Sequence, residues 1–136
     1  MPNLILTEIG WEERVRDKLG VKEAYLPNSS IGQPDIIGVA EANIIKVMPD
    51  YAEITGFEKT WLEAATVCEC AVLLCPSMPA RLPSRTQGPH TTIGIDVDWE
   101  KKKSELENER DNFLGRLSGY DYIPRFRLAG PSRRSR

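Results

Sequence analysis

The sequence lacks the motifs by which many enzymes are recognised. It contains no Gly-x-x-x-x-Gly-Lys phosphate loop, no Gly-x-Gly-x-x-Gly fingerprint and no calcium-binding loop. Its single histidine, His90, is not accompanied by a serine or cysteine elbow motif, so the residues indicate no pair of nucleophile and general base. We therefore expect that the protein is not an enzyme.

Cysteine is scarce, and its placement excludes two common uses. The three cysteines, Cys68, Cys70 and Cys75, are odd in number and too crowded for a disulfide framework. Thiolate metal sites need about four convergent ligands, and on a helix Cys70 would point away from the face shared by Cys68 and Cys75. We expect reduced thiols that pack in the core, with no metal and no cofactor.

Long apolar runs are also missing. No uninterrupted run of about 18 apolar residues occurs, and the first residues lack the basic start and apolar core of a secretory signal. A chain of 136 residues with 40% hydrophobic content fits one domain. The expectation is a soluble, intracellular protein without a membrane anchor.

Charge is present but unevenly distributed. Residues 1–75 hold 12 acidic and 6 basic side chains, whereas residues 120–136 hold five arginines against Asp121. A general nucleic-acid binder is expected to spread lysine and arginine over a folded face, so an acidic body argues against that class. The pattern predicts a helical domain over residues 1–119 and an extended basic tail over residues 120–136.

Two helices are predicted in the first half. Thr7 can cap a helix that runs to about Leu19, with Gly20 as its stop. Residues 26–34 have turn chemistry, and a second helix fits between Pro34 and Pro49.

The third predicted helix is the apolar one. Thr60 and Glu63 form a capping box, and residues 61–75 are apolar around most of the circumference. Such a helix must be largely surrounded by protein. Pro76 is expected to end it.

The stretch that follows is rich in proline and then alternates. Pro76, Pro79, Pro83 and Pro89 are expected to prevent regular structure up to Gly88. From Thr91 to Val97 the sequence alternates, with Ile93, Ile95 and Val97 on one side. A lone strand leaves its backbone groups and one apolar face unsatisfied unless something pairs with it. We expect a long loop followed by one short strand or one arm of a hairpin, whose backbone groups and apolar side need a partner.

A fourth helix is predicted from Trp99 to about Ser118. Asp98 can cap it, which is a simpler role than a metal or acid–base pair with Asp96. Charged residues fill its middle, so packing is expected mainly at its two ends. Trp11, Trp61 and Trp99 lie near helix beginnings and are expected to anchor the helices to the core. The predicted fold class is mainly α, a small bundle of about four helices.

The tail combines arginine with large apolar side chains, the residue types that dominate interface energetics. A solvated terminus without a partner remains an alternative. The candidate partner-binding residues are Tyr122, Arg125, Phe126, Arg127, Leu128, Arg133 and Arg134.

The order of features resembles a known family. Two helices lead to Pro49-Asp50, followed by an Ala-rich central helix with Glu63-Ala64-Ala65-Thr66-Val67, a long loop with an alternating segment and a final charged helix. This layout, over residues 4–119, resembles the small head-to-tail connector (adaptor, head completion) proteins of tailed bacteriophages. The tail beyond Gly119 departs from the family's common core.

The resemblance implies a structural virion protein and a homo-oligomeric ring, usually twelve-fold, in the neck. Such a ring binds the portal and the tail or neck proteins and extends the channel through which DNA passes, without sequence specificity. Assembly would take place in the host cytoplasm. Ile93, Ile95 and Val97 would then contact a neighbouring subunit. The alternative is a non-viral adaptor or regulatory module that binds an acidic partner through its basic tail.

Overall fold

The protein is described by a computed structural model that covers residues 3–82 and 97–117. Within these residues the chain is mainly helical and has no strand, so the predicted fold class is confirmed at that level. The α-helices are α1 (Trp11–Leu19), α2 (Asn28–Ile31), α3 (Val39–Val47), α4 (Phe57–Leu74), α5 (Met78–Arg81) and α6 (Trp99–Gly115). Single turns of π or 3-10 helix join them: η1 (Pro34–Gly38), η2 (Tyr51–Glu53) and η3 (Cys75–Ser77).

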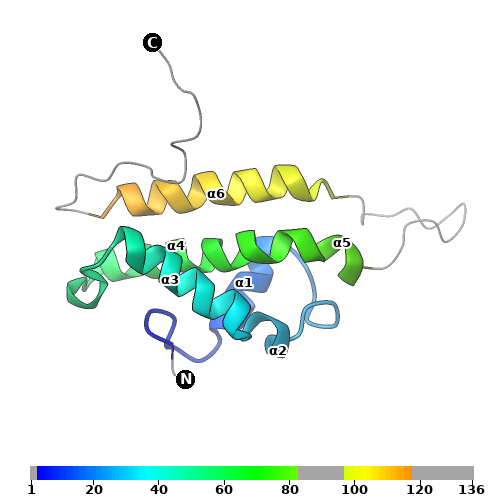
Figure 1. The fold of residues 1–136 in the computed structure, drawn as a ribbon, viewed down its shortest axis with the longest axis horizontal. Helices are drawn as coiled ribbons and strands as arrows, with labels where there is room; N and C mark the ends of the chain where they lie inside the picture. The colour runs from blue at the N-terminus through cyan, green and yellow to red at the C-terminus, as the bar shows by residue number, and fades with distance from the viewer. Residues whose placement is uncertain (1–2, 83–96, 118–136) are drawn as a thin grey trace, which may run out of the picture.

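Helix α4 is the centre of the fold. Figure 1 shows α6 running antiparallel to α4 on one side, with α1 and α3 on the opposite side. Ten of the 18 residues of α4 are buried, among them Leu62, Val67 and Leu74. The apolar circumference predicted from the sequence is therefore matched by neighbours on several sides.

The apolar character of α4 extends into α5. The stretch Phe57–Arg81 is long and apolar enough to cross a membrane by length and composition, but 67% of its most apolar window is buried inside the fold. The core helix of a helical bundle has the same properties. Glu63 and Glu69 interrupt this stretch, so it contains no uninterrupted run of about 18 apolar residues.

Two clusters of buried side chains make up the core. The larger one joins α1, α4 and α6 through residues such as Val15, Ala71 and Leu106. The smaller one lies at the other end and contains Ile44 and Leu114. Trp11 belongs to the first cluster, Trp99 packs against it and Trp61 packs against the second, so the predicted anchoring of the three tryptophans is confirmed.

Two predicted helix starts are wrong. Helix α1 begins at Trp11 after Gly10, whose φ of 95° is left-handed, and Thr7 lies outside it in the preceding loop. Helix α4 begins at Phe57, three residues before Thr60, after Gly56 with a φ of 70°. Glycine adopts positive φ without a side-chain penalty. At both helix starts a left-handed glycine ends the preceding loop, whereas polar caps were predicted at Thr7 and Thr60.

The predicted cap of the last helix is confirmed. The Asp98 carboxylate accepts a hydrogen bond from the backbone N–H of Lys101 at 3.1 Å. Helix α6 ends at Gly115, three residues before the predicted end, and Leu117 beyond it is still buried. Asp96 lies outside the described residues.

The proline-rich and turn-rich segments contain more helix than predicted. Pro79 lies in the first turn of α5, where proline's missing N–H costs nothing, so Pro76 and Pro79 do not prevent regular structure. Helix α2 lies within residues 26–34 and buries Ile31. The predicted second helix is present as η1 followed directly by α3.

The middle of α6 was expected to be exposed, and this expectation is wrong. Arg110 and Asp111 are buried, at 3% and 5% exposure, next to buried Leu106. Arg110 forms an ion pair with Glu69 of α4 at 2.6 Å. A charged helix centre therefore packs on the core because the opposite helix supplies the compensating charge.

Candidate interaction surfaces

The segment before α1 carries an open surface with an exposed apolar residue. Residues Thr7–Gly10 connect the buried Leu6 to the start of α1, and they place Ile9 with its side chain fully exposed, at 103%. Leu6 and Trp11 are buried on either side. A single exposed apolar side chain is common on protein surfaces, so the interest of Ile9 depends on the surface around it.

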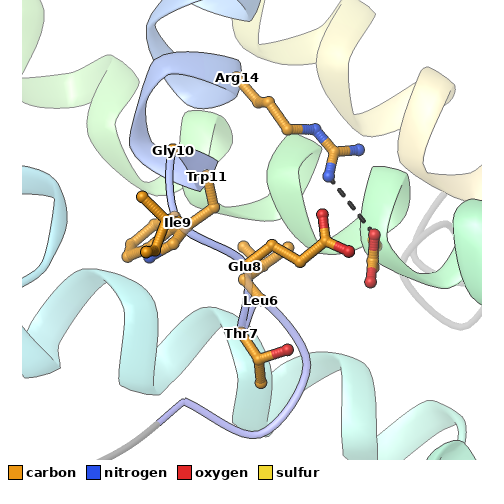
Figure 2. A pocket seen from close by; sticks show the side chains of 8 residues that line it. Leu6, Thr7, Glu8, Ile9, Gly10, Trp11 and Arg14 are labelled. Carbon is orange, nitrogen blue, oxygen red and sulfur yellow. Dashed lines mark hydrogen bonds and ion pairs between the residues drawn. The ribbon is translucent and has the colours of Figure 1, made fainter.

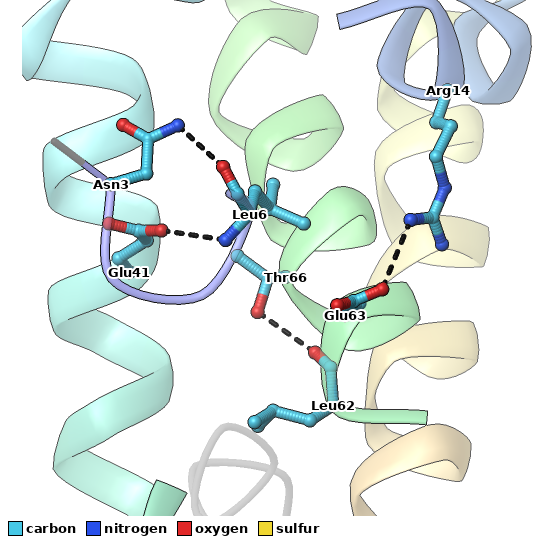
Figure 3. Close-up of polar contacts among 7 residues, drawn as sticks. All are labelled: Asn3, Leu6, Arg14, Glu41, Leu62, Glu63 and Thr66. Atoms are coloured by element: carbon cyan, nitrogen blue, oxygen red, sulfur yellow. Dashed lines mark hydrogen bonds and ion pairs between the residues drawn. The ribbon is translucent and has the colours of Figure 1, made fainter. Parts of the chain in front are cut away.

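A buried carboxylate fixes this segment. Glu41 of α3 accepts hydrogen bonds from the backbone N–H groups of Leu4, Ile5 and Leu6, at 2.7 Å for the Ile5 N–H. The Asn3 side chain donates to the Leu6 carbonyl oxygen at 2.7 Å, and Figure 3 shows both contacts. Because these backbone groups lack partners in helices, the single carboxylate determines the path of the chain into the Thr7–Gly10 loop.

An open groove of about 560 Å³ runs along this loop. We call it the N-terminal groove. Its lining combines apolar and acidic side chains and contains no lysine or arginine. The lining residues are Asn3, Leu6, Thr7, Glu8, Ile9, Gly10, Trp11, Glu12 and Asn28. The groove therefore offers an apolar wall and negative charge to whatever enters it.

A second contact network holds the wall formed by α2. Arg16 is 4% exposed and donates hydrogen bonds to the Leu26 carbonyl oxygen at 3.2 Å and to Asn28 Oδ1 at 2.6 Å. It also pairs with Glu13 at 2.6 Å. These bonds fix Asn28 relative to α1, so both walls of the groove are set before any partner binds.

A smaller cavity of about 50 Å³ continues from the groove toward α4. Arg14 of α1 and Glu63 of α4 form an ion pair of 3.5 Å at its end. Figure 2 shows the Glu8 side chain extending toward this pair, while Ile9 points away from it. Glu63 therefore links α1 to α4, which is a different role from the helix cap predicted from the sequence.

Another pocket, of about 230 Å³, lies where the described chain is interrupted. It is lined by Leu19, Gly20, Val21, Lys22, Tyr25, Leu82, Val97 and Trp99. Leu82 and Val97, which flank residues 83–96 in the sequence, therefore line the same mostly apolar pocket. We call it the arm-base pocket.

The structure tests the sequence-predicted contact residues only in part. Val97 is 41% exposed, lies outside any strand and lines the arm-base pocket. Ile93 and Ile95 lie outside the described residues, as does the tail from Tyr122 to Arg134. Ile9 was not predicted as a contact residue. The available signal was an apolar, β-branched residue directly before Gly10 and Trp11.

The cysteines have the role expected of them. All three are free and buried. Burial raises the pKa of Cys68 from an ordinary value of 9.0 to about 12, with a smaller contribution from the carboxylate of Glu109. Burial likewise raises the pKa of Cys75 to about 11, and that of Cys70 further still. Neutral, enclosed thiols are poor nucleophiles and poor metal ligands.

No group of three or more histidine, cysteine, aspartate or glutamate side chains that could hold a metal ion is found among residues 3–82 and 97–117. The buried polar side chains there bond to each other or to the backbone, as in the contact of 2.8 Å between Asn43 and Glu69, except that Asp111 Oδ2 has no hydrogen-bond partner among the described residues.

Comparisons with known proteins give no relative. No protein-family model matches the chain, and neither a curated protein nor a solved structure is significantly similar to it.

Proposed function

We propose that the protein is a structural component of the neck of a tailed bacteriophage, where copies assemble as a ring between the portal and the tail. The proposal starts from the layout of helices that resembles the connector family. A small, mainly helical fold with α4 at its centre is compatible with that resemblance. The ring would extend the DNA channel and would have no catalytic activity.

The observation that carries the proposal is the convergence of Leu82 and Val97 on the arm-base pocket. These two residues flank residues 83–96, and the last part of that sequence alternates through Ile93 and Ile95. A segment with this connectivity is suited to project from the bundle, and its apolar side requires a surface to cover it. A neighbouring copy would supply that surface, and such head-to-tail contacts close into a ring when the rotation between copies permits.

The charge of the described chain supports a role around DNA without binding to it. Residues 3–82 and 97–117 carry 18 acidic and 12 basic side chains. A basic lumen would retain DNA through its phosphates, whereas an acidic one allows DNA to pass. The arginines of the tail, including Arg133 and Arg134, are proposed to contact the adjoining portal ring.

The test is co-assembly. Full-length protein is incubated with the portal ring encoded in the same genome, and complexes are analysed by light scattering after size exclusion and by electron microscopy. A ring of copies on the portal is the expected result. No binding to that portal would contradict the proposal. Genes for a portal and a major capsid protein directly upstream would add independent support.

The competing function is an adaptor that binds an acidic partner through its tail. It predicts a monomer or dimer at all concentrations and no affinity for a portal. The same light-scattering experiment separates the two, because only the neck protein forms a higher oligomer in the presence of the portal.

A further inference from the structure

We propose that the N-terminal groove is the docking site for the C-terminal segment Tyr122–Leu128 of a second copy of this chain. The inference rests on the proposed function in that it requires copies to assemble. It goes further because it assigns an acceptor surface to the tail. The terminal arginines beyond Leu128 would remain available for the portal.

The first argument is the exposure of Ile9. With the single chain alone, this side chain is 103% exposed, while Leu6 and Trp11 on either side are buried. The loop that presents it is held by Glu41 and by the left-handed Gly10. Single exposed apolar side chains are common on protein surfaces, but Ile9 lies on a fixed loop that lines a groove, where a segment docked in the groove would cover it.

The second argument is charge. Glu8 and Glu12 line the groove, no lysine or arginine lines it, and neither carboxylate forms an ion pair with another described residue. Phosphate groups of nucleic acid would be repelled there. A cationic segment would be attracted, and the attraction would be specific if arginine could pair with the carboxylates.

The third argument is the complementary composition of the tail. Arg125 and Arg127 alternate with Phe126 and Leu128. In an extended segment the two kinds of side chain point to opposite faces, so the apolar pair can meet Ile9 while the arginines reach the groove's acids.

Disulfide trapping between two full-length variants tests the proposal. One copy carries Ile9→Cys and the other carries Phe126→Cys, with different affinity tags. The native thiols do not interfere, because Cys68, Cys70 and Cys75 are buried and their pKa values are raised. The expected result is a covalent dimer that contains both tags. A matched control replaces Ile9→Cys with Phe57→Cys, which is also strongly exposed, at 84%, but lies outside the groove.

The charge contribution is tested in the same assay. The double change Glu8→Lys and Glu12→Lys is expected to slow cross-linking at least tenfold, and adding Arg125→Glu with Arg127→Glu is expected to restore it. The control pair, Glu100→Lys and Glu105→Lys on the exposed side of α6, should have little effect. Added salt should slow cross-linking between the Ile9→Cys and Phe126→Cys variants that carry no charge changes, because the attraction is between solvent-exposed charges.

Each other outcome overturns the inference. Cross-linking as fast through Phe57→Cys as through Ile9→Cys would show that the tail has no preference for the groove. When both cysteines are placed in one chain, a disulfide that forms only within the monomer, with no covalent dimer, would show that the tail binds its own groove. Absence of any cross-link, with portal binding intact, would remove the docking site and leave the proposed function standing.

Discussion

Glu69 of α4 and Arg110 of α6 form an ion pair of 2.6 Å at the centre of the helix pair, with side chains that are 4% and 3% exposed. Arg110 Nε also donates to Asp111 Oδ1 at 3.2 Å, and Asn43 of α3 donates to Glu69 at 2.8 Å. Three helices therefore meet at one buried polar cluster. It holds two carboxylates, Glu69 and Asp111, against the single guanidinium of Arg110, so the loss of that cation is expected to be costly.

Removing the cation tests this directly. Arg110→Met retains much of the side-chain volume but leaves Glu69 and Asp111 buried without their cation. We expect a loss of about 3–5 kcal/mol in the free energy of unfolding, measured by urea denaturation. Arg116→Met, at an exposed position on the same segment, should change it by less than about 0.5 kcal/mol. Equal effects for the two variants would contradict the assigned role.

Glu41 is expected to control the N-terminal segment. Glu41→Ala removes the acceptor of the Leu4, Ile5 and Leu6 N–H groups. Hydrogen bonds to charged groups contribute about 1.5–3 kcal/mol each, and the freed N–H groups can regain some bonds to water if the segment loosens, so we expect a net loss of about 2–3 kcal/mol. Amide hydrogen exchange should accelerate at these three residues first. Glu53→Ala, at an exposed position, is the control, and unchanged exchange in Glu41→Ala would refute the role.

The thiols predict a loss of stability at alkaline pH. The pKa of Cys68 is about 12 in the folded chain and 9.0 is its ordinary value, so the folded state retains the proton that the unfolded state releases. Stability is fully present below about pH 9 and falls between about pH 9 and 12, by up to about 1.4 kcal/mol per pH unit for this thiol. Urea midpoints measured at rising pH should show this slope reduced in Cys68→Ala. An identical slope in the two proteins would exclude Cys68 as its origin.

The predicted arm is tested by charge. Replacing Ile93 and Ile95 together by aspartate should abolish ring formation and leave the helical circular dichroism unchanged, since the pair is proposed to be buried only between copies. Light scattering with the portal present measures assembly. Unfolding of the isolated monomer would instead show that these residues belong to the core of their own chain.

The tail is tested by deletion. Removing residues 121–136 should leave the melting temperature nearly unchanged but weaken docking to the portal, because the proposed tail contacts are made with other molecules. Calorimetry and portal binding measure the two effects. A large decrease in melting temperature would mean that the tail packs on its own domain.

The sequence predicted the main helices because their patterns are local. The apolar circumference of α4 and the Asp98 cap depend on neighbouring residues in the chain, and both are confirmed. The helix starts after Gly10 and Gly56 were missed because a capping residue and a left-handed glycine compete for the same function. Helices α2 and α5 are too short for a periodic signal, and burial of Ile31 and Met78 stabilises them.

The surfaces were less predictable. Sequence reasoning cannot anticipate that Glu41 collects three backbone N–H groups from a segment more than thirty residues away, since no spacing rule connects them. The N-terminal groove depends on that contact. For the same reason Arg110 and Asp111 were expected in solvent, because the partner charge lies on another helix.

The arm-base pocket brings together two residues that are 15 positions apart in the sequence, Leu82 and Val97. Leu82 and Val97 line the same pocket. The packing of the helices therefore does not depend directly on the number of residues between these two positions. For a flexible loop, each doubling of length adds only about 0.6 kcal/mol to the entropic cost of closure. Residues inserted between Leu82 and Val97 are therefore expected to leave the stability of α4 and its neighbours nearly unchanged.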